Sequence, residues 1–219
     1  MERLILLGVE ALRFLEREGL RVLKSSLAQD EEEAVSAAKE IGFPVALKLL
    51  SPEVIHKTEA EGVRVDLRNE REVREAHRRL IEAFHASHPE GELEGVMIQE
   101  MGEGTEVIVG ALLDPQFGPV IMFGLGGIFV EALRDVSFRI IPIEKKDAQD
   151  MIREIKGFPI LQGVRGEDRG VDLRALEDLL LNISNLIERH PAILEMDINP
   201  AFACPEGYAI CDARIRIRS

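Results

Sequence analysis

The chain has 219 residues, 46% of them hydrophobic and 31% charged, which is enough to bury a core as one large domain or as two smaller lobes. Its formal net charge of −13 argues against a general nucleic-acid binder, because such proteins need a basic surface to displace counterions. No apolar run approaches the ~18 residues of a membrane span, and two cysteines are too few for a disulfide framework. We therefore expect a soluble, cytoplasmic protein with no nucleic-acid or membrane partner. The absence of Trp and the abundance of Glu and Arg favour a thermophilic source.

Helix and strand patterns alternate in the first half of the chain. The opening MERLILLGVEALRFLEREGL predicts an amphipathic helix rather than a signal peptide, because acids interrupt its apolar run. RVLKSS (21–26) then predicts a short strand. A helix is predicted to begin after Asp30, whose carboxylate can cap the first turn while Glu33 closes a capping box, and to end at Gly42.

The next elements surround a polar loop. Pro44 opens the predicted strand VALKLL (45–50), and GVRVDL (62–67) predicts a second strand after the loop. Asn69 and Glu72 predict the start of a further helix with one apolar face.

From Gly95 onward the pattern changes to strands separated by glycine turns. Four strands are predicted first: VMIQEM (96–101), TEVIVGALL (105–113), PVIMFGLGG (119–127) and FRIIPI (138–143). Two helices follow, around 148–155 and 173–189, and the chain closes with ILEMDINP (193–200) and a strand pair, GYAICDARIRI (207–217).

This order predicts an α+β protein of two lobes, residues 1–98 with the leading helix and residues 99–219. Each lobe should be a largely antiparallel sheet backed by helices, and a ligand cleft is expected between them near 99–104.

Several polar residues stand in or beside these predicted strands. Lys48 interrupts an apolar strand, so it either reaches water from an edge strand or meets an anion, and the residue alone favours neither. Gln99, Glu100 and Met101 end a strand at the expected crossing between lobes, and Glu106 follows shortly. Acids in such positions are, taken alone, more often surface residues than ligands.

The C-terminal stretch LEMDINP is more informative. Glu195, Asp197 and Asn199 alternate with apolar residues and therefore share one face of a strand, while Asp212 lies in the adjacent predicted strand. Carboxylate and amide oxygens, completed by phosphate and water, are the ligands that Mg²⁺ prefers in nucleotide sites. A solvated strand face is the alternative, but the buried character of the intervening residues weakens it.

The loop SPEVIHKTEAEGV (51–63) places His56 beside Lys57 and Thr58, a cation and a hydroxyl suited to hold phosphate. The other histidines fit no metal spacing and are predicted to lie on the surface: His77, His85, His88 and His190. GLGGIFVE (124–131) is similar to glycine-rich phosphate loops but matches neither a Walker A sequence nor a Rossmann fingerprint.

Together, three stretches strongly resemble one family over nearly the whole chain. They are GFPVALKLLSPEVIHKTEAEGV, IQEMGEGTEVIVGALLDPQFGPVIMFGLGGIFVEALRDVSFRIIP and LEMDINPAF. The family is the ATP-grasp (beta) subunits of ADP-forming acetyl-CoA synthetases, within the NDP-forming acyl-CoA synthetases. The resemblance implies an ATP-grasp fold with the nucleotide in the cleft between lobes. It also implies an enzyme that interconverts acyl-CoA, ADP and phosphate with acid, CoA and ATP by way of phosphohistidine.

Roles for individual residues follow from the resemblance. The signature SP-x-x-x-HK matches Ser51, Pro52, His56 and Lys57, which makes His56 a phosphoryl carrier, with Asp197 placed to orient it. The implied nucleotide contacts are Lys48 at a phosphate, Gln99, Glu100 and Met101 at the adenine, and Glu106 at the ribose. The implied magnesium ligands are Asn199 and Asp212.

The implied cofactors are ATP or ADP with Mg²⁺, and the implied partner is a CoA-binding alpha subunit in an α₂β₂ assembly, because the chain lacks the CoA-binding segment. Two rival interpretations remain. A carboxylate–amine ligase of the same fold would need no carrier histidine, and a regulatory nucleotide-binding lobe would not need the full set of site residues.

Overall fold

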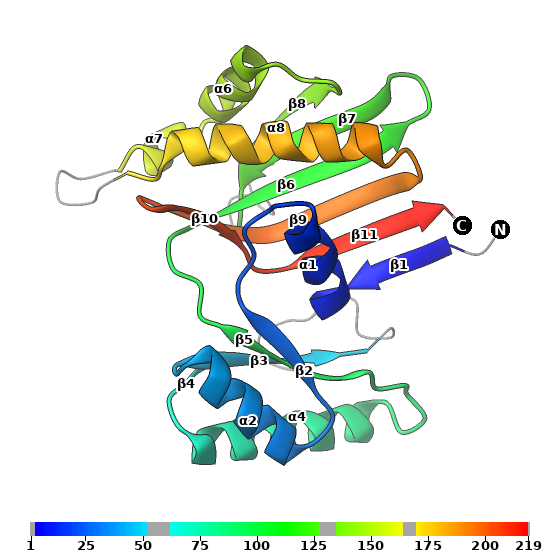
Figure 1. The fold of residues 1–219 in the computed structure, drawn as a ribbon, viewed down its shortest axis with the longest axis vertical. Helices are drawn as coiled ribbons and strands as arrows, with labels where there is room; N and C mark the ends of the chain where they lie inside the picture. Colours follow the sequence, from blue (N-terminus) through cyan, green and yellow to red (C-terminus); the bar gives the residue numbers. More distant parts are fainter. Residues whose placement is uncertain (1–2, 52–61, 128–134, 164–169, 219) are drawn as a thin grey trace. The chain divides into compact units, whose positions relative to one another are not determined.

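A computed structural model of the protein describes residues 3–51, 62–127, 135–163 and 170–218. The chain forms two compact units. Unit 1 comprises Met1–Val22 and Gly102–Ser219, and unit 2 comprises Leu23–Met101. Each unit is a sheet of antiparallel strands with helices packed on it, as Figure 1 shows, which confirms the predicted α+β class. Within the described ranges no helix is both long and apolar enough to cross a membrane.

Unit 2 is a four-stranded sheet in the order β2-β5-β3-β4, with two helices. Its strands are β2 (Ser25–Ala28), β3 (Val45–Leu50), β4 (Val63–Leu67) and β5 (Gly95–Glu100), and its helices are α2 (Glu31–Ile41) and α4 (Glu70–Ser87). The helices pack on one face of the sheet and form the core of this unit with Leu47, Leu49 and Ile98.

Local capping signals in the sequence are confirmed in unit 2. The Asp30 carboxylate accepts hydrogen bonds from the backbone N–H groups of Glu32 and Glu33, and the Asn69 side chain accepts one from Glu72. The expected capping box is displaced by one residue, because the Glu33 carboxylate accepts from the Gln29 N–H at 2.8 Å instead of from Asp30. Gly42 ends α2 with a φ of +98°, a conformation that favours glycine.

One histidine differs from its expected surface position. His77 lies on the inner side of α4 with only 5% of its surface exposed, and its Nε2 has no hydrogen-bond partner among the described residues. Burial lowers the pKa of His77 below its ordinary value of 6.5, while the nearby carboxylates of Glu31 and Asp30 raise it. The sequence prediction failed here because an imidazole can substitute for an apolar side chain in a helix stripe.

Unit 1 is a seven-stranded sheet in the order β1-β11-β9-β6-β7-β8, with β10 paired to β9. Its strands are β1 (Arg3–Leu7), β6 (Thr105–Asp114), β7 (Gly118–Leu125), β8 (Val136–Ile140), β9 (Ile193–Cys204), β10 (Gly207–Ile210) and β11 (Ala213–Arg218). Its helices are α1 (Gly8–Arg17), α6 (Lys145–Glu154), α7 (Phe158–Leu161) and α8 (Leu173–Arg189).

The N-terminal segment corrects two expectations. Its first residues form β1 rather than the start of a helix, and β1 pairs with β11 from the other end of the chain. The leading segment therefore belongs with residues 102–219 in unit 1 and not with a lobe of residues 1–98. A long-range strand pairing leaves no trace in local helical periodicity, which is why the sequence pattern missed it. The strand expected at 21–26 begins only at Ser25, while Val22 forms a bridge with Ile210.

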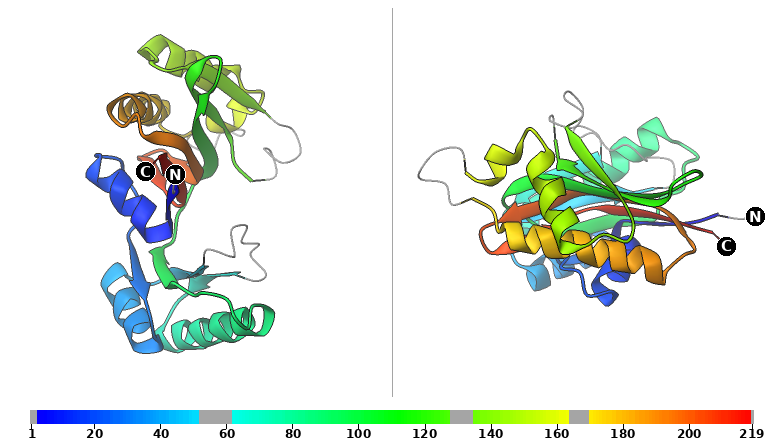
Figure 2. Two further views of the ribbon diagram at one scale, coloured as in Figure 1. Left: turned by 90° about the vertical axis from the view of Figure 1, so that its right-hand side faces the viewer. Right: turned by 90° about the horizontal axis from the view of Figure 1, so that it is seen from above.

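Helices cover one face of the unit 1 sheet. Figure 2 (left) shows α1 and α8 on the same side of this sheet, and α6 contacts β8 and α8. The side chains that alternate toward this side are buried, among them Val109, Ile121 and Met196. We call the opposite side the open face, and it carries Asp197 and the alternate residues of the neighbouring strands.

The buried imidazole of His77 should make the stability of unit 2 depend on pH. Its folded pKa lies below its unfolded value of about 6.5, so the unfolded state binds the proton more readily. Stability should be constant above about pH 7 and fall as the pH drops below 6.5. Urea midpoints measured by circular dichroism between pH 8 and pH 5.5 test this expectation.

The matched control is His85, an exposed histidine two turns further along α4. H77Q should flatten the pH dependence in this window, whereas H85Q should leave it unchanged. Equal pH dependence in both variants would show that His77 is not the group responsible.

Candidate functional site

Three oxygen-bearing side chains predicted from the sequence come together in unit 1. Asp197 and Asn199 lie on β9 with their side chains exposed, and the buried Ile198 between them points into the core. Asp212 immediately precedes β11, and its carbonyl accepts a hydrogen bond from the Asn199 N–H at 3.1 Å. Its half-buried carboxylate also accepts from the Ala213 N–H at 2.9 Å. The pairing of β9 with β11 therefore places the expected magnesium ligands at neighbouring positions.

Negative charge accumulates at this place. Partial desolvation by the surrounding protein raises the pKa of Asp197 above its ordinary value, and the carboxylates of Glu195 and Asp212 raise it further. Arg214 is the cross-strand neighbour of Asp197 and opposes these effects. A cation placed here would relieve repulsion between carboxylates, so the donor set fits a hard divalent ion such as Mg²⁺.

No group of three or more His, Cys, Asp or Glu side chains is arranged to hold a metal within the part of the chain that the structure describes. The expected ligands are one amide and one carboxylate, so such a site would need oxygens from the nucleotide and water to complete it.

Glu106 lies on β6, the strand next to β9, and strand alternation places it on the open face with Gly110 and Leu112. The turn after β7 packs directly against it: the Gly126 N–H donates to the Glu106 carbonyl at 2.7 Å. A Cβ on Gly126 would stand 2.8 Å from the Glu106 Cβ, and Gly127 has a φ of +61°. The glycine run thus allows the chain to pass close to Glu106.

Unit 2 carries the other predicted nucleotide contacts on β3 and β5. Lys48 is 9% exposed and Gln99 is 1% exposed. Lys48 lies opposite Met97 and Gln99 lies opposite Ala46, so both side chains share the face of this sheet that points away from the α2–α4 core. Lys48 is therefore not an edge-strand lysine reaching water, because β3 lies between β5 and β4.

Glu100 is the last residue of β5 and is hydrogen-bonded to Lys24, the residue that precedes β2. Its carboxylate accepts from the Lys24 N–H at 3.2 Å, and its own N–H donates to the Lys24 carbonyl at 2.9 Å. Met101 follows as a half-buried residue outside the strand. Both the carboxylate and the backbone N–H of Glu100 therefore hold the chain that precedes β2.

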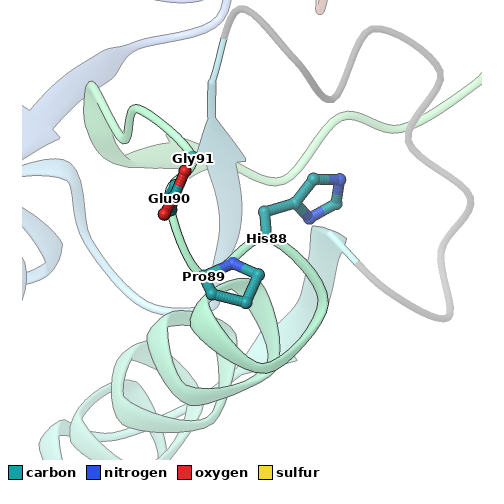
Figure 3. Close-up of a pocket in the computed structure, with 4 residues that line it drawn as sticks. All are labelled: His88, Pro89, Glu90 and Gly91. Atoms are coloured by element: carbon teal, nitrogen blue, oxygen red, sulfur yellow. The ribbon is translucent and has the colours of Figure 1, made fainter.

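His56 lies outside the described residues. Ser51, the last described residue before it, is buried, and its hydroxyl donates to the Glu92 carbonyl at 2.8 Å. A surface hollow, shown in Figure 3, is lined by His88, Pro89, Glu90 and Gly91, none of which is a predicted site residue.

The fold and the clustered residues can be compared with known proteins. Residues 1–217 match the ATP-grasp domain family. The chain is 48% identical to acetate–CoA ligase (ADP-forming) I subunit beta of Pyrococcus furiosus over 94% of this chain and 89% of that protein. The chain belongs to the ATP-grasp family of ADP-forming acetate–CoA ligase beta subunits. The expected family and ATP-grasp fold are therefore confirmed.

A longer relative and two solved structures also match this chain over nearly its whole length. Acetate–CoA ligase (ADP-forming) I of Archaeoglobus fulgidus is 44% identical, and the match covers 95% of this chain but 30% of that protein. An acetyl-coenzyme A synthetase 1 of Ca. Korarchaeum cryptofilum, solved with coenzyme A, Ca-AMPCP and HgCl⁺, matches with a TM-score of 0.93 at 47% identity, covering 98% of this chain and 93% of that one. A further structure of that synthetase, with coenzyme A and Mg-AMPPCP, has its phosphohistidine segment pointing towards the nucleotide binding site; its TM-score is 0.84 at 45% identity, with the same coverage.

Sequence reasoning missed two features of this region. Arg214 adjoins Asp197 only through the β9–β11 register, and the glycine turn adjoins Glu106 only through the β6–β7 register. The alternation in DARIRIR places Arg214 and Arg216 on one face, which was the available signal, but a partner strand cannot be identified from it.

The close approach at Gly126 yields a stability prediction. G126A should destabilise unit 1 by about 1–3 kcal/mol, because its Cβ would overlap the Cβ of Glu106 and neither group can move without shifting backbone. Chemical denaturation measures the effect.

The control is G110A, on β6 itself. There the nearest atom to an added Cβ is the flexible Cε of Met122 at 3.2 Å, which can rotate away. If G126A and G110A lower the free energy of unfolding equally, the conformational freedom of the backbone, rather than the contact with Glu106, explains why residue 126 is glycine.

Proposed function

We propose that this chain is the nucleotide-binding subunit of an ADP-forming acyl-CoA synthetase and that it passes a phosphoryl group between Mg-nucleotide and His56. The observation that supports this role best is the cluster of Asp197, Asn199 and Asp212 on the open face of unit 1. A beta subunit with which this chain is 48% identical, and another with which it is 45% identical, are named as ADP-forming acetate–CoA ligases.

The two metal ligands and the orienting carboxylate have separate tasks in this proposal. Asn199 and Asp212 would hold Mg²⁺, and the metal would supply neutralisation of phosphate charge. Asp197 accepts a hydrogen bond from the imidazole of His56, which fixes the tautomer and supports the charged phosphoimidazole.

Unit 2 supplies contacts to the nucleotide. Lys48 pairs with a phosphate oxygen, for which its low exposure is suitable because a desolvated ammonium gains more from an anion. Gln99, Glu100 and the backbone of Met101 contact adenine, and Glu106 of unit 1 accepts from the ribose hydroxyls. The assignment of adenine rather than guanine is part of the proposal.

His56 accepts the phosphoryl group. In the direction of ATP cleavage, a neutral ring nitrogen attacks the γ-phosphorus, a P–N bond forms, and the bond from phosphorus to the bridging oxygen breaks as ADP leaves. The reverse sequence makes ATP. A carboxylate–amine ligase would instead transfer phosphate directly to a carboxylate, so the phosphohistidine distinguishes these two mechanisms.

The partner in this proposal is a CoA-binding alpha subunit. The relative from Archaeoglobus fulgidus is about three times as long as the matched region, so part of that ligase lies outside the segment that this chain resembles. We propose that this chain associates with a separate subunit of that kind as an α₂β₂ assembly and that the acyl and CoA sites lie mainly there.

D212N should weaken binding of Mg-ATP, because it removes one formal charge from a site built of oxygen ligands. Binding of metal-free ATP should change little, and the fold should persist because the carboxylate is only half-buried. Isothermal titration calorimetry with and without Mg²⁺ measures both quantities.

E195Q is the matched control, since it removes one charge from the neighbouring strand β9, where Glu195 is paired with Arg216 at 2.8 Å. If D212N and E195Q bind Mg-ATP equally well, the assignment of Asp212 as a metal ligand is wrong.

H56A should abolish transfer of label from γ-labelled ATP to this subunit while leaving Mg-ATP affinity nearly intact. The label in the wild-type complex should be acid-labile and base-stable, as expected of phosphohistidine. D197N should reduce labelling more than nucleotide binding, because its task is to orient the imidazole. Labelling is measured by gel autoradiography after acid and base treatment.

H85A, which removes an exposed histidine of unit 2, is the control and should label normally. Near-normal synthesis of ATP from acetyl-CoA by an H56A complex would refute the carrier role. It would favour direct transfer, as in the ligase alternative.

A further inference from the structure

An apolar patch occupies the open face of unit 1 across three strands. We call it the β6–β8 patch; its members are Leu112, Val120, Met122, Phe138 and Ile140. Leu112, Val120 and Ile140 form one cross-strand row, and Gly110, Met122 and Phe138 form the next. Leu112, Phe138 and Ile140 are 47%, 51% and 55% exposed. Adjacent side chains in two rows make a continuous surface rather than scattered residues.

This surface is not required for the core of unit 1. The helices pack on the other face, where Ser137 donates to the Met151 carbonyl of α6 at 2.9 Å and Arg139 pairs with Glu154. An antiparallel sheet covered on one face normally carries polar side chains on the other. On β8 the alternation is reversed, with the three apolar residues outward and the two polar residues toward α6. Contiguous exposed apolar surface of this kind marks an interaction site.

The patch adjoins the candidate site without a gap. Gly110 lies directly opposite Asp197, and Leu112 lies directly opposite Glu195, so the patch begins one strand away from the cluster on β9. Gly110 has no side chain, and the Met122 methyl group would lie 3.2 Å from a Cβ there, which brings apolar surface up to Asp197. Whatever covers the patch therefore lies beside the group that orients the phosphoryl carrier.

We propose that the β6–β8 patch is the docking surface for the CoA-binding partner subunit. This inference rests on the proposed function, because that function requires a partner to exchange the phosphoryl group at the open face. The partner presents apolar side chains to the patch and Lys or Arg to the strand that borders it, since Glu195 and Asp197 form that border.

Charge favours this partner over a second copy of the chain. A two-fold interface on the patch would bury the same surface of both copies. It would also join two chains of net charge −13. One strand beyond the border, Arg216 pairs with Glu195 and Arg214 lies opposite Asp197, so Asp197 is the border carboxylate without an ion pair among the described residues.

The experiment measures binding of the CoA-binding subunit from the same organism to the full-length chain by calorimetry. F138S and I140S, singly and together, should weaken this binding by about tenfold or more, because they remove the two most exposed apolar side chains of the patch. Mg-ATP binding by these variants should be unchanged, which also shows that they fold.

F117S is the matched control. Phe117 is 62% exposed in the turn between β6 and β7 and is not a member of the patch. Loss of partner binding in the patch variants, with normal binding in F117S, supports the inference.

Three outcomes overturn it, and they can be told apart. If the wild-type chain binds Mg-ATP but no CoA-binding subunit, the partner assignment fails and the docking surface with it. If the wild type binds the partner and the patch variants bind equally well, only the docking surface is wrong. If sedimentation shows wild-type dimers that F138S and I140S dissociate without affecting partner binding, the patch joins two copies instead.

Discussion

The pairing of β9 with both of its long neighbours is the constraint on which the candidate site depends. β9 is hydrogen-bonded to β6 on one side and to β11 and β10 on the other, so it cannot slide without breaking ladders on both sides. Because side chains alternate along a strand, burying Met196 and Ile198 forces Asp197 and Asn199 to the open face. A slip of one residue would bury a carboxylate and expose two apolar side chains. The core therefore determines where these oxygen-bearing side chains lie.

The same strand pairing places three carboxylates close together, those of Glu195, Asp197 and Asp212. Glu195 is the only one of the three carboxylates at this place that forms an ion pair within the described ranges, with Arg216. Asp197 and Asp212 remain close to each other and to Glu195, which is unfavourable for the folded protein on its own. The cluster keeps some access to water, since Asp197 is exposed and Asp212 is half-buried, and this water screens part of the repulsion. A bound cation or a cationic partner would turn that repulsion into binding free energy.

The stability of unit 2 comes mainly from its buried apolar cluster rather than from the ion pairs between its helices. Its two helices are joined by ion pairs of Arg74 with Glu32, Arg78 with Glu31, and Lys39 with Glu70, all with at least one exposed partner. Pairs of this kind contribute about 0–1 kcal/mol each, so the buried apolar cluster of the sheet and helices is the main source of stability. That cluster fixes β3 and β5 and thereby holds Lys48 and Gln99 on their shared face.

The sequence by itself determined what depends on local geometry. Caps at Asp30 and Asn69, the bounds of α8 and the alternation of LEMDINP are set by neighbouring residues, so their patterns can be read directly. The combined motifs also identified the family, because so long a string of matches does not arise from composition. Only the tertiary structure decided that β1 joins unit 1 and that His77 is buried. It also decided that Arg214 lies beside Asp197 and that Gly126 packs on Glu106. Each of these results depends on pairing or packing between segments distant in the chain, and periodicity within one segment does not specify its partner.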